Sequence, residues 1–351
     1  MAGYMSNNIL QYKEKRIELY KKLEGERKSK LLVYITGDRN GWGTRIAEDA
    51  ADYIAEHLDI IGPVNKISLF LYTTGGSTLA GWNIVNLIRQ FCKELEIIVP
   101  NKARSTGTLM CLGADNIIMT KQATLGPIDP SVNNPLNPEI PNMQNQRYPV
   151  SVEAIKGFIE LAKHELAIKD DNALASIFGT LAEKVHPLVL GEVYRAIGQI
   201  QMLARKLLRH QVTDEVKIQK IISFLCSESG SHDYTINRRE AKEELGLNVE
   251  TPSDELYKLI NDIYLSIKEE LELQKNFDPN LDTDIKEKKF LIKRALIESI
   301  YGKSNVFISE GLFRKTIVPV NIPVAQLPNF NKIPSAEVVQ IQKIYEGWLS
   351  I

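Results

Sequence analysis

The chain has 351 residues, of which 44% are hydrophobic and 25% are charged, and its formal net charge is −1. This length is sufficient for two domains, and the composition is that of an ordinary globular protein. A net charge so close to zero gives no electrostatic argument for binding nucleic acid. The cysteines Cys92, Cys111 and Cys226 are far apart without metal-ligand spacing, so we expect reduced, packed thiols and no metal site.

The N-terminal stretch 1–30 is dense in Lys, Arg and Glu and lacks an apolar central region, so we expect no signal peptide. No run of about 18 apolar residues predicts a membrane-spanning helix. We therefore expect a soluble, cytoplasmic protein, while a peripheral contact between the helical half and a membrane surface stays open. Residues 9–28 predict a charged helix, either docked on the core or a neighbouring subunit, or solvated as an arm.

Short apolar strands alternate with helices in residues 31–120. The pattern predicts strands at 31–36, 67–72, 97–100 and 116–120, and helices at 46–58, 79–91 and 105–114. Such alternation indicates a sheet covered on both faces, hence an α/β fold. Residues 133–147 are rich in Pro and Asn and predict a functional or partner-facing loop, followed by a helix at 152–166.

The second half of the chain has a different character. Residues 174–300 predict mainly helix, with amphipathic runs at 193–208, 215–225 and 255–274. Residues 307–331 carry three prolines among β-branched residues and predict an extended arm rather than a core strand. A short helix is predicted at 338–349. The expected organisation is an N-terminal helix (1–30), an α/β core (31–173), a helical domain (174–305) and a C-terminal arm with a short helix (306–351).

Two consecutive glycines, Gly75 and Gly76, follow a predicted strand and precede a predicted helix. Glycine lets the backbone approach a ligand closely, and two N–H groups facing a cleft can stabilise an oxyanion. The alternative is a tight strand–helix turn. A phosphate-binding loop is excluded, because no Gly-Lys-Ser/Thr sequence closes the loop.

Ser105 opens the predicted helix of small and apolar residues at 105–114. Its side chain would lie at the positive end of the helix dipole, with the N–H of Thr106 or Gly107 available to a carbonyl oxygen. A plain serine N-cap is the alternative, because serine is very common at that position.

Together these motifs resemble the Clp/crotonase superfamily and, within it, signal peptide peptidase A and the serine dehydrogenase proteinase family. The resemblance rests on Tyr-Thr-Thr-Gly-Gly at 72–76, Lys-Ala-Arg-Ser-Thr-Gly-Thr-Leu at 102–109, Leu-Gly-Ala-Asp at 112–115 and Leu-Gly-Pro-Ile-Asp-Pro-Ser at 125–131. It extends to residues 186–191 and 231–236 in the helical half.

The resemblance implies a Clp/crotonase-like spiral core in which Ser105 attacks a peptide carbonyl. The backbone N–H groups of Gly76 and Thr106 would form the oxyanion hole. An extended substrate would lie beside the segment after Gly76 and beside residues 124–127, which include Gly126. The resemblance also implies a peptide or protein substrate, a homo-oligomer, and no metal or organic cofactor.

A serine nucleophile needs a group that accepts its proton. In the Clp proteolytic subunits that this chain resembles, a histidine follows the serine by about 25 residues. This chain has Asp129 in that region, and Asp129 either orients a base or caps a turn. Signal peptide peptidases place a lysine about fifty residues after the serine, and Lys156 lies at that distance, with Lys163 two turns later. His186 and His232 are further candidates, although a capping or packing role is the commoner explanation for each.

The sequence thus predicts a soluble serine endopeptidase that acts through Ser105, with Gly75, Gly76, Thr106 and Gly126 around the substrate and a lysine base. The second hypothesis is a catalytically inactive Clp-like scaffold for peptide binding or assembly, because no histidine occupies the Clp position. The third is acyl-CoA chemistry, because the oxyanion donors of crotonases resemble the glycine pair.

Overall fold

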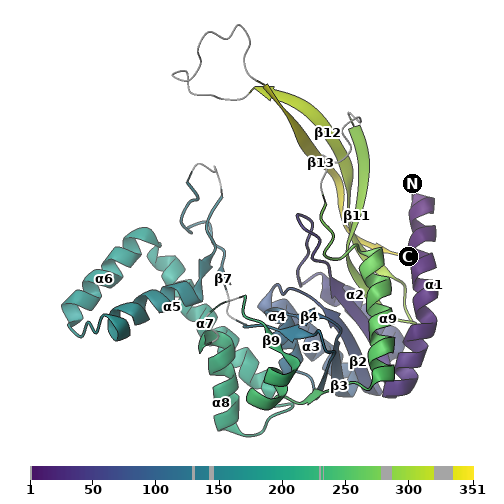
Figure 1. The fold of residues 1–351 in the computed structure, drawn as a ribbon, viewed down its shortest axis with the longest axis horizontal. Helices are drawn as coiled ribbons and strands as arrows, with labels where there is room; N and C mark the ends of the chain where they lie inside the picture. Colours follow the sequence, from purple (N-terminus) through teal and green to yellow (C-terminus); the bar gives the residue numbers. More distant parts are fainter. Residues whose placement is uncertain are drawn as a thin grey trace.

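The computed structural model describes residues 2–128, 131–141, 146–228, 231, 233–277, 287–319 and 335–351. Within these ranges, a mixed eight-stranded sheet forms the centre of the molecule (Figure 1). Its strands lie in the order β10 (Val249–Glu250), β5 (Asn116–Met119), β3 (Cys92–Val99), β2 (Val64–Tyr72), β1 (Lys30–Thr36), β11 (Glu287–Glu298), β12 (Asn305–Pro319) and β13 (Ser335–Ser350).

The predicted strands of the first half are β1, β2, β3 and β5, and all four are parallel neighbours. One face of this sheet is covered by α2 (Ala50–Ile61), α3 (Thr78–Phe91) and α4 (Thr106–Leu112), and the other by α1 (Ala2–Arg27) and α9 (Asp254–Glu270). In β2, Leu69 and Leu71 belong to the first apolar layer, whereas Phe70 belongs to the second. Successive side chains of a strand point to opposite faces, so the continuous apolar run is the signature of a sheet buried on both sides. The α/β prediction is confirmed.

Helix α1 docks on the core, which decides between the two alternatives for residues 9–28. Arg16 is fully buried and forms ion pairs with Glu298 (2.9 Å) and Glu270 (2.7 Å). The Tyr20 hydroxyl also donates a hydrogen bond to Glu298 (2.7 Å). Buried charges are tolerated when they are paired and hydrogen-bonded, so this cluster holds α1 in place only while it is complete.

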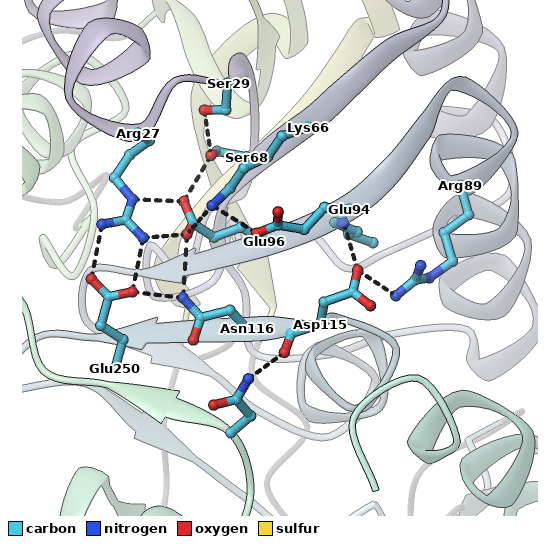
Figure 2. A network of polar contacts seen from close by, with 12 residues as sticks. Arg27, Ser29, Lys66, Ser68, Arg89, Glu94, Glu96, Asp115, Asn116 and Glu250 are labelled. Atoms are coloured by element: carbon cyan, nitrogen blue, oxygen red, sulfur yellow. Dashed lines mark hydrogen bonds and ion pairs between the residues drawn. The ribbon is translucent and has the colours of Figure 1, made fainter. Parts of the chain in front are cut away.

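A second polar network joins the end of α1 to three strands (Figure 2). Arg27 of α1 donates hydrogen bonds to Glu96 of β3 and Glu250 of β10, and Lys66 of β2 forms an ion pair with Glu96 (3.0 Å). Burial by itself would raise the pKa of Glu96, but the hydrogen bonds from Arg27 and Lys66 outweigh it and hold that pKa below its ordinary value. The network is therefore stable in its charged form.

The C-terminal part of the chain corrects three predictions. Residues 338–349 are not a helix but belong to β13, and the predicted arm begins with β12, whose Val306 and Ile308 are core residues. Strand β11 falls within the segment that was predicted to be helical. These three strands pair antiparallel and attach to β1 through β11, and part of the ribbon projects from the body (Figure 1). Residues 320–331 of the predicted arm lie outside the described residues.

Helices do dominate residues 152–228, as predicted. They are α5 (Val152–Glu160), α6 (Asp171–Lys184), α7 (Pro187–Leu208) and α8 (Glu215–Ser223), and a π-helical turn, Leu161–Glu165, continues α5. Ala204, Leu207 and Leu208 of α7 join the apolar layer that contains α4. Among the described helices, none alone has the length and apolar composition needed to cross a bilayer; α6 and α7 meet that requirement only as a pair bent by 104°. The domain boundaries stay predictions.

Candidate active site

The glycine pair and Ser105 are brought together by pairing between the end of β2 and β4 (Lys102–Ala103). The Thr73 N–H donates to the Lys102 carbonyl (3.1 Å), and the Arg104 N–H donates to the Thr73 carbonyl (3.1 Å). A Cβ on Gly75 would stand 2.7 Å from the Cβ of Ser105, which is closer than real contacts allow. The φ of Gly75 is +114°, a second reason why only glycine fits. The structure thus brings Gly75 and Ser105 into direct contact.

Ser105 has a strained backbone, with φ 52° and ψ −117°, at the turn between β4 and α4. It occupies the N-cap position, but its side chain makes no capping hydrogen bond, so the plain N-cap alternative does not apply. Non-glycine residues in such conformations cost about 1–3 kcal/mol and are concentrated at functional sites. A strained strand-to-helix turn also exposes the nucleophilic serine of α/β-hydrolases. Within the described residues, the Ser105 hydroxyl has no hydrogen-bond partner.

Two backbone N–H groups close to Ser105 lack acceptors in the part of the chain that the structure describes. The Gly75 carbonyl accepts a hydrogen bond from the Ile46 N–H (2.9 Å), so in a trans peptide the Gly76 N–H points away from Ile46. Thr106 is the first residue of α4, where a backbone N–H has no acceptor within its own helix. The Thr106 hydroxyl donates to the Gly76 carbonyl (2.7 Å) and ties both segments together. These two donors can bind a developing oxyanion.

Charged and phenolic groups support the strand that leads to Ser105. Lys102 forms an ion pair with Asp38 (2.8 Å), and the Tyr72 hydroxyl donates to the same carboxylate oxygen (2.8 Å). Burial, and then the Asp38 carboxylate, raise the pKa of Tyr72 well above its ordinary value. Burial also raises the pKa of Tyr264, whose ring lies against that of Tyr72, to about 12. Lys102 is therefore held by Asp38, and both phenols are protonated at neutral pH.

The segment expected beside the substrate is already paired on both sides. Strand β6 (Thr124–Leu125) lies between β4 and β9 (Ile236–Asn237). The Gly126 N–H donates to the Thr108 hydroxyl (2.9 Å). A peptide therefore cannot pair with β6 unless β9 is displaced, and the Gly126 N–H is not free for a ligand in this structure.

No predicted base lies against Ser105 in the described ranges. Lys156 is 41% exposed on α5 and pairs with Glu160 (3.5 Å), and Lys163 is exposed on the adjoining π-helical turn. His186 accepts a hydrogen bond from the Leu188 N–H (3.2 Å) and caps α7. Asp129 and His232 lie outside the described residues. The identity of the base stays a prediction.

Sequence reasoning missed the residues that shape this site from a distance. Ile46 holds the glycine loop through its backbone, and nothing in its side chain signals that role. Asp38 follows the carboxyl end of β1, and ligands of parallel sheets bind at that edge. Its position in the sequence could therefore have marked it as a site residue. Arg104 lies within the motif at 102–109, but the sequence assigned it no role.

Comparisons with known proteins agree with the motif-based resemblance. The family model described as "ClpP-like SDH-type serine proteinase" matches residues 7–186, more than half of the chain. Two uncharacterized proteins of Methanocaldococcus jannaschii, MJ0137 and MJ1495, are 33% and 28% identical to the chain over 196 and 188 residues. These matches cover 55% and 53% of this chain and 57% and 52% of the relatives, so the chain spans about half the length of these curated relatives.

Among solved structures, a mutant of a membrane-bound stomatin-specific protease covers 66% of this chain and 85% of its own, with 17% identity and a TM-score of 0.38. A ClpP1 mutant from Listeria monocytogenes covers 69% of this chain and 98% of its own, with 14% identity and a TM-score of 0.36.

Proposed function

Because the chain belongs to the ClpP-like SDH-type serine proteinase family, we propose that it hydrolyses peptide bonds with Ser105 as the nucleophile. One observation supports this most strongly. Ser105 has a strained backbone and a hydroxyl unbonded within the described residues, and it stands beside the unbonded N–H groups of Gly76 and Thr106. A structural serine would be expected to cap α4, and this one does not.

In the proposed reaction, the Ser105 oxygen forms a bond to the substrate carbonyl carbon while a base accepts the hydroxyl proton. The carbonyl oxygen becomes an oxyanion held by the Gly76 and Thr106 N–H groups. The carbon–nitrogen bond then breaks, and the base gives its proton to the leaving amine. Water attacks the acyl-enzyme by the same route and releases the second product.

Lys156 is the proposed base, and His232 is the alternative. In this role Lys156 would exchange its partner Glu160 for Ser105, and it would act as a base only in its neutral form. Asp129 is proposed to orient the base or to shape the adjoining turn. The homo-oligomer remains a prediction that follows from the resemblance, and the cytoplasmic location remains one that follows from the sequence pattern.

Labelling with a fluorophosphonate probe tests the nucleophile. The chain should be labelled at Ser105, as located by peptide mapping, and Ser105→Ala should abolish labelling. Ser151→Ala is a matched control, because Ser151 also stands at a helix N-cap but its side chain caps α5. Labelling that persists in a folded Ser105→Ala chain would refute the assignment. If Ser105 is the labelled residue, slower labelling of Lys156→Met or of His232→Ala identifies the base.

The inactive-scaffold hypothesis keeps one specific observation in its favour, because no base contacts Ser105 in the described ranges. It predicts that a folded chain binds extended peptides but neither reacts with the probe nor cleaves them. Peptide binding measured on the Ser105→Ala chain, beside labelling of the unmodified chain, separates the two proposals.

A further inference from the structure

Arg104 is the residue directly before the nucleophile, and its backbone is fixed on both sides. Its N–H donates to the Thr73 carbonyl (3.1 Å), and its carbonyl accepts from the Gly107 N–H (2.8 Å). The Cβ and Cγ of Arg104 both lie 3.5 Å from the position that a Cβ on Gly126 would occupy. The arginine stem therefore runs along the backbone of Gly126, in the segment next to the nucleophile.

The guanidinium of Arg104 has no carboxylate partner among the described residues. Its Nε is buried and makes no hydrogen bond, while the residue as a whole keeps partial access to solvent. Two cations on the neighbouring segments do have partners, since Lys102 pairs with Asp38 and Arg238 donates to the Met119 carbonyl. A buried donor left without an acceptor destabilises the folded chain, so such a group is expected to have a partner in the working protein.

We propose that Arg104 selects substrates that carry a carboxylate close to the scissile bond. This inference rests on the proposed function, because it assigns a substrate class to the Ser105 site. A guanidinium presents a planar fork of donors that matches a carboxylate in two parallel hydrogen bonds. Extended peptide rises about 3.3 Å per residue, so an arginine side chain reaches groups roughly two residues from the attacked carbonyl. The carboxylate belongs either to an Asp or Glu side chain or to the C-terminus of the substrate.

Matched internally quenched peptides test this selection. They share one sequence and carry Glu, Gln or Lys within two residues of the cleaved bond, and each is made with a free and an amidated C-terminus. For the unmodified chain, we expect kcat/KM to be about 10–100-fold higher for a peptide with the carboxylate than for its neutral match, mainly through KM. A preference for Glu over Gln identifies a side-chain carboxylate, and a preference for the free terminus identifies a terminal one.

Arg104→Gln should remove the preference by lowering kcat/KM for the carboxylate peptide to that of its neutral match. Arg104→Lys should keep part of it, since a lysine keeps the charge but loses the fork. Arg209→Gln is the matched control and should leave the preference unchanged, because Arg209 is exposed and already pairs with Glu215 on α8. Equal kcat/KM for charged and neutral peptides, or equal losses for all peptides in Arg104→Gln, would overturn the inference.

Two further measurements separate failure of this inference from failure of the proposed function. Fluorophosphonate labelling at Ser105 reports the nucleophile alone and should proceed in Arg104→Gln. Fluorescence anisotropy with the same Glu and Gln peptides on the Ser105→Ala chain reports binding without turnover. If labelling succeeds but both peptides bind equally, the selection by Arg104 is wrong while the peptidase proposal stands. If the Glu peptide binds more tightly but Ser105 is never labelled, the selection holds at a site that is not catalytic.

Discussion

Replacing Ser105 by glycine and by alanine should give stabilities in the opposite order from an ordinary helix position. Both variants lose the same hydroxyl, which makes no hydrogen bond within the described residues, so their difference isolates the backbone. At φ 52° and ψ −117°, alanine keeps a strain of about 1–3 kcal/mol that glycine largely relieves. Glycine loses about 0.4–1 kcal/mol through the greater freedom of its unfolded chain. Ser105→Gly should therefore be more stable than Ser105→Ala by about 1–2 kcal/mol.

The matched position is Ser266, which lies within the core helix α9 and has ordinary helical neighbours. There glycine should be less stable than alanine by about 1 kcal/mol, because glycine is a poor helix former. The assay is urea unfolding of all four variants, compared by midpoint at equal slope. Our reasoning about the strained turn is wrong if Ser105→Gly unfolds at a lower urea concentration than Ser105→Ala. If glycine were less stable than alanine at both positions, the turn at Ser105 would carry no backbone strain that glycine relieves.

Three other outcomes follow from the structure. Gly75→Ala should reduce fluorophosphonate labelling at least 100-fold, because its Cβ would displace Ser105, whereas Gly25→Ala on α1 meets no atom within 4 Å and should label normally. Arg16→Met should lower the free energy of unfolding by about 3–5 kcal/mol, because among the described residues it leaves the buried Glu298 carboxylate without a paired cation and Glu270 with Lys293 alone; a loss below about 1 kcal/mol in urea unfolding would contradict this. Glu96 has a lowered pKa, so its stabilisation is present above the unfolded value of about 4.3 and is lost as pH falls below it; Glu96→Gln should flatten the stability profile there, and parallel profiles would count against the network.

The parallel half of the sheet could be predicted because its residues obey local rules. The run at 67–72 is apolar on both sides, so β2 is buried on both sides, and α3 follows it at helical spacing. The glycine pair and Ser105 could be predicted as a candidate site for the same reason, since each stands at a strand-to-helix turn. Their direct contact, in contrast, depends on Thr73 pairing with β4, which no local pattern reveals.

Strand β13 was predicted as a helix because a bulge disguises its alternation. Glu310 pairs with Tyr345 and Gly311 pairs with Lys343, so Ile344 is an extra residue in β13. One extra residue moves the following side chains to the opposite face of the strand. The alternation of apolar and polar residues is then interrupted, and the combined spacing resembles that of an amphipathic helix. The general base could not be settled from the sequence for a different reason. Lys156 was selected by distance along the chain, but side chains on separate helices meet only if the tertiary packing brings them together.

The family match stops at residue 186, yet the chain cannot complete its core with those residues alone. One edge of β1 pairs with β11, where Tyr34 lies opposite Ile297. The face of the sheet opposite α3 is covered by Ile260 and Ile263 of α9. A fragment cut at the end of the family match would leave an unpaired edge beside a bare apolar layer, a combination that favours aggregation. On the ribosome, the nascent N-terminal half must remain incomplete for on the order of ten seconds before its closing strand is made. The segment that the family model matches is therefore smaller than the segment that folds.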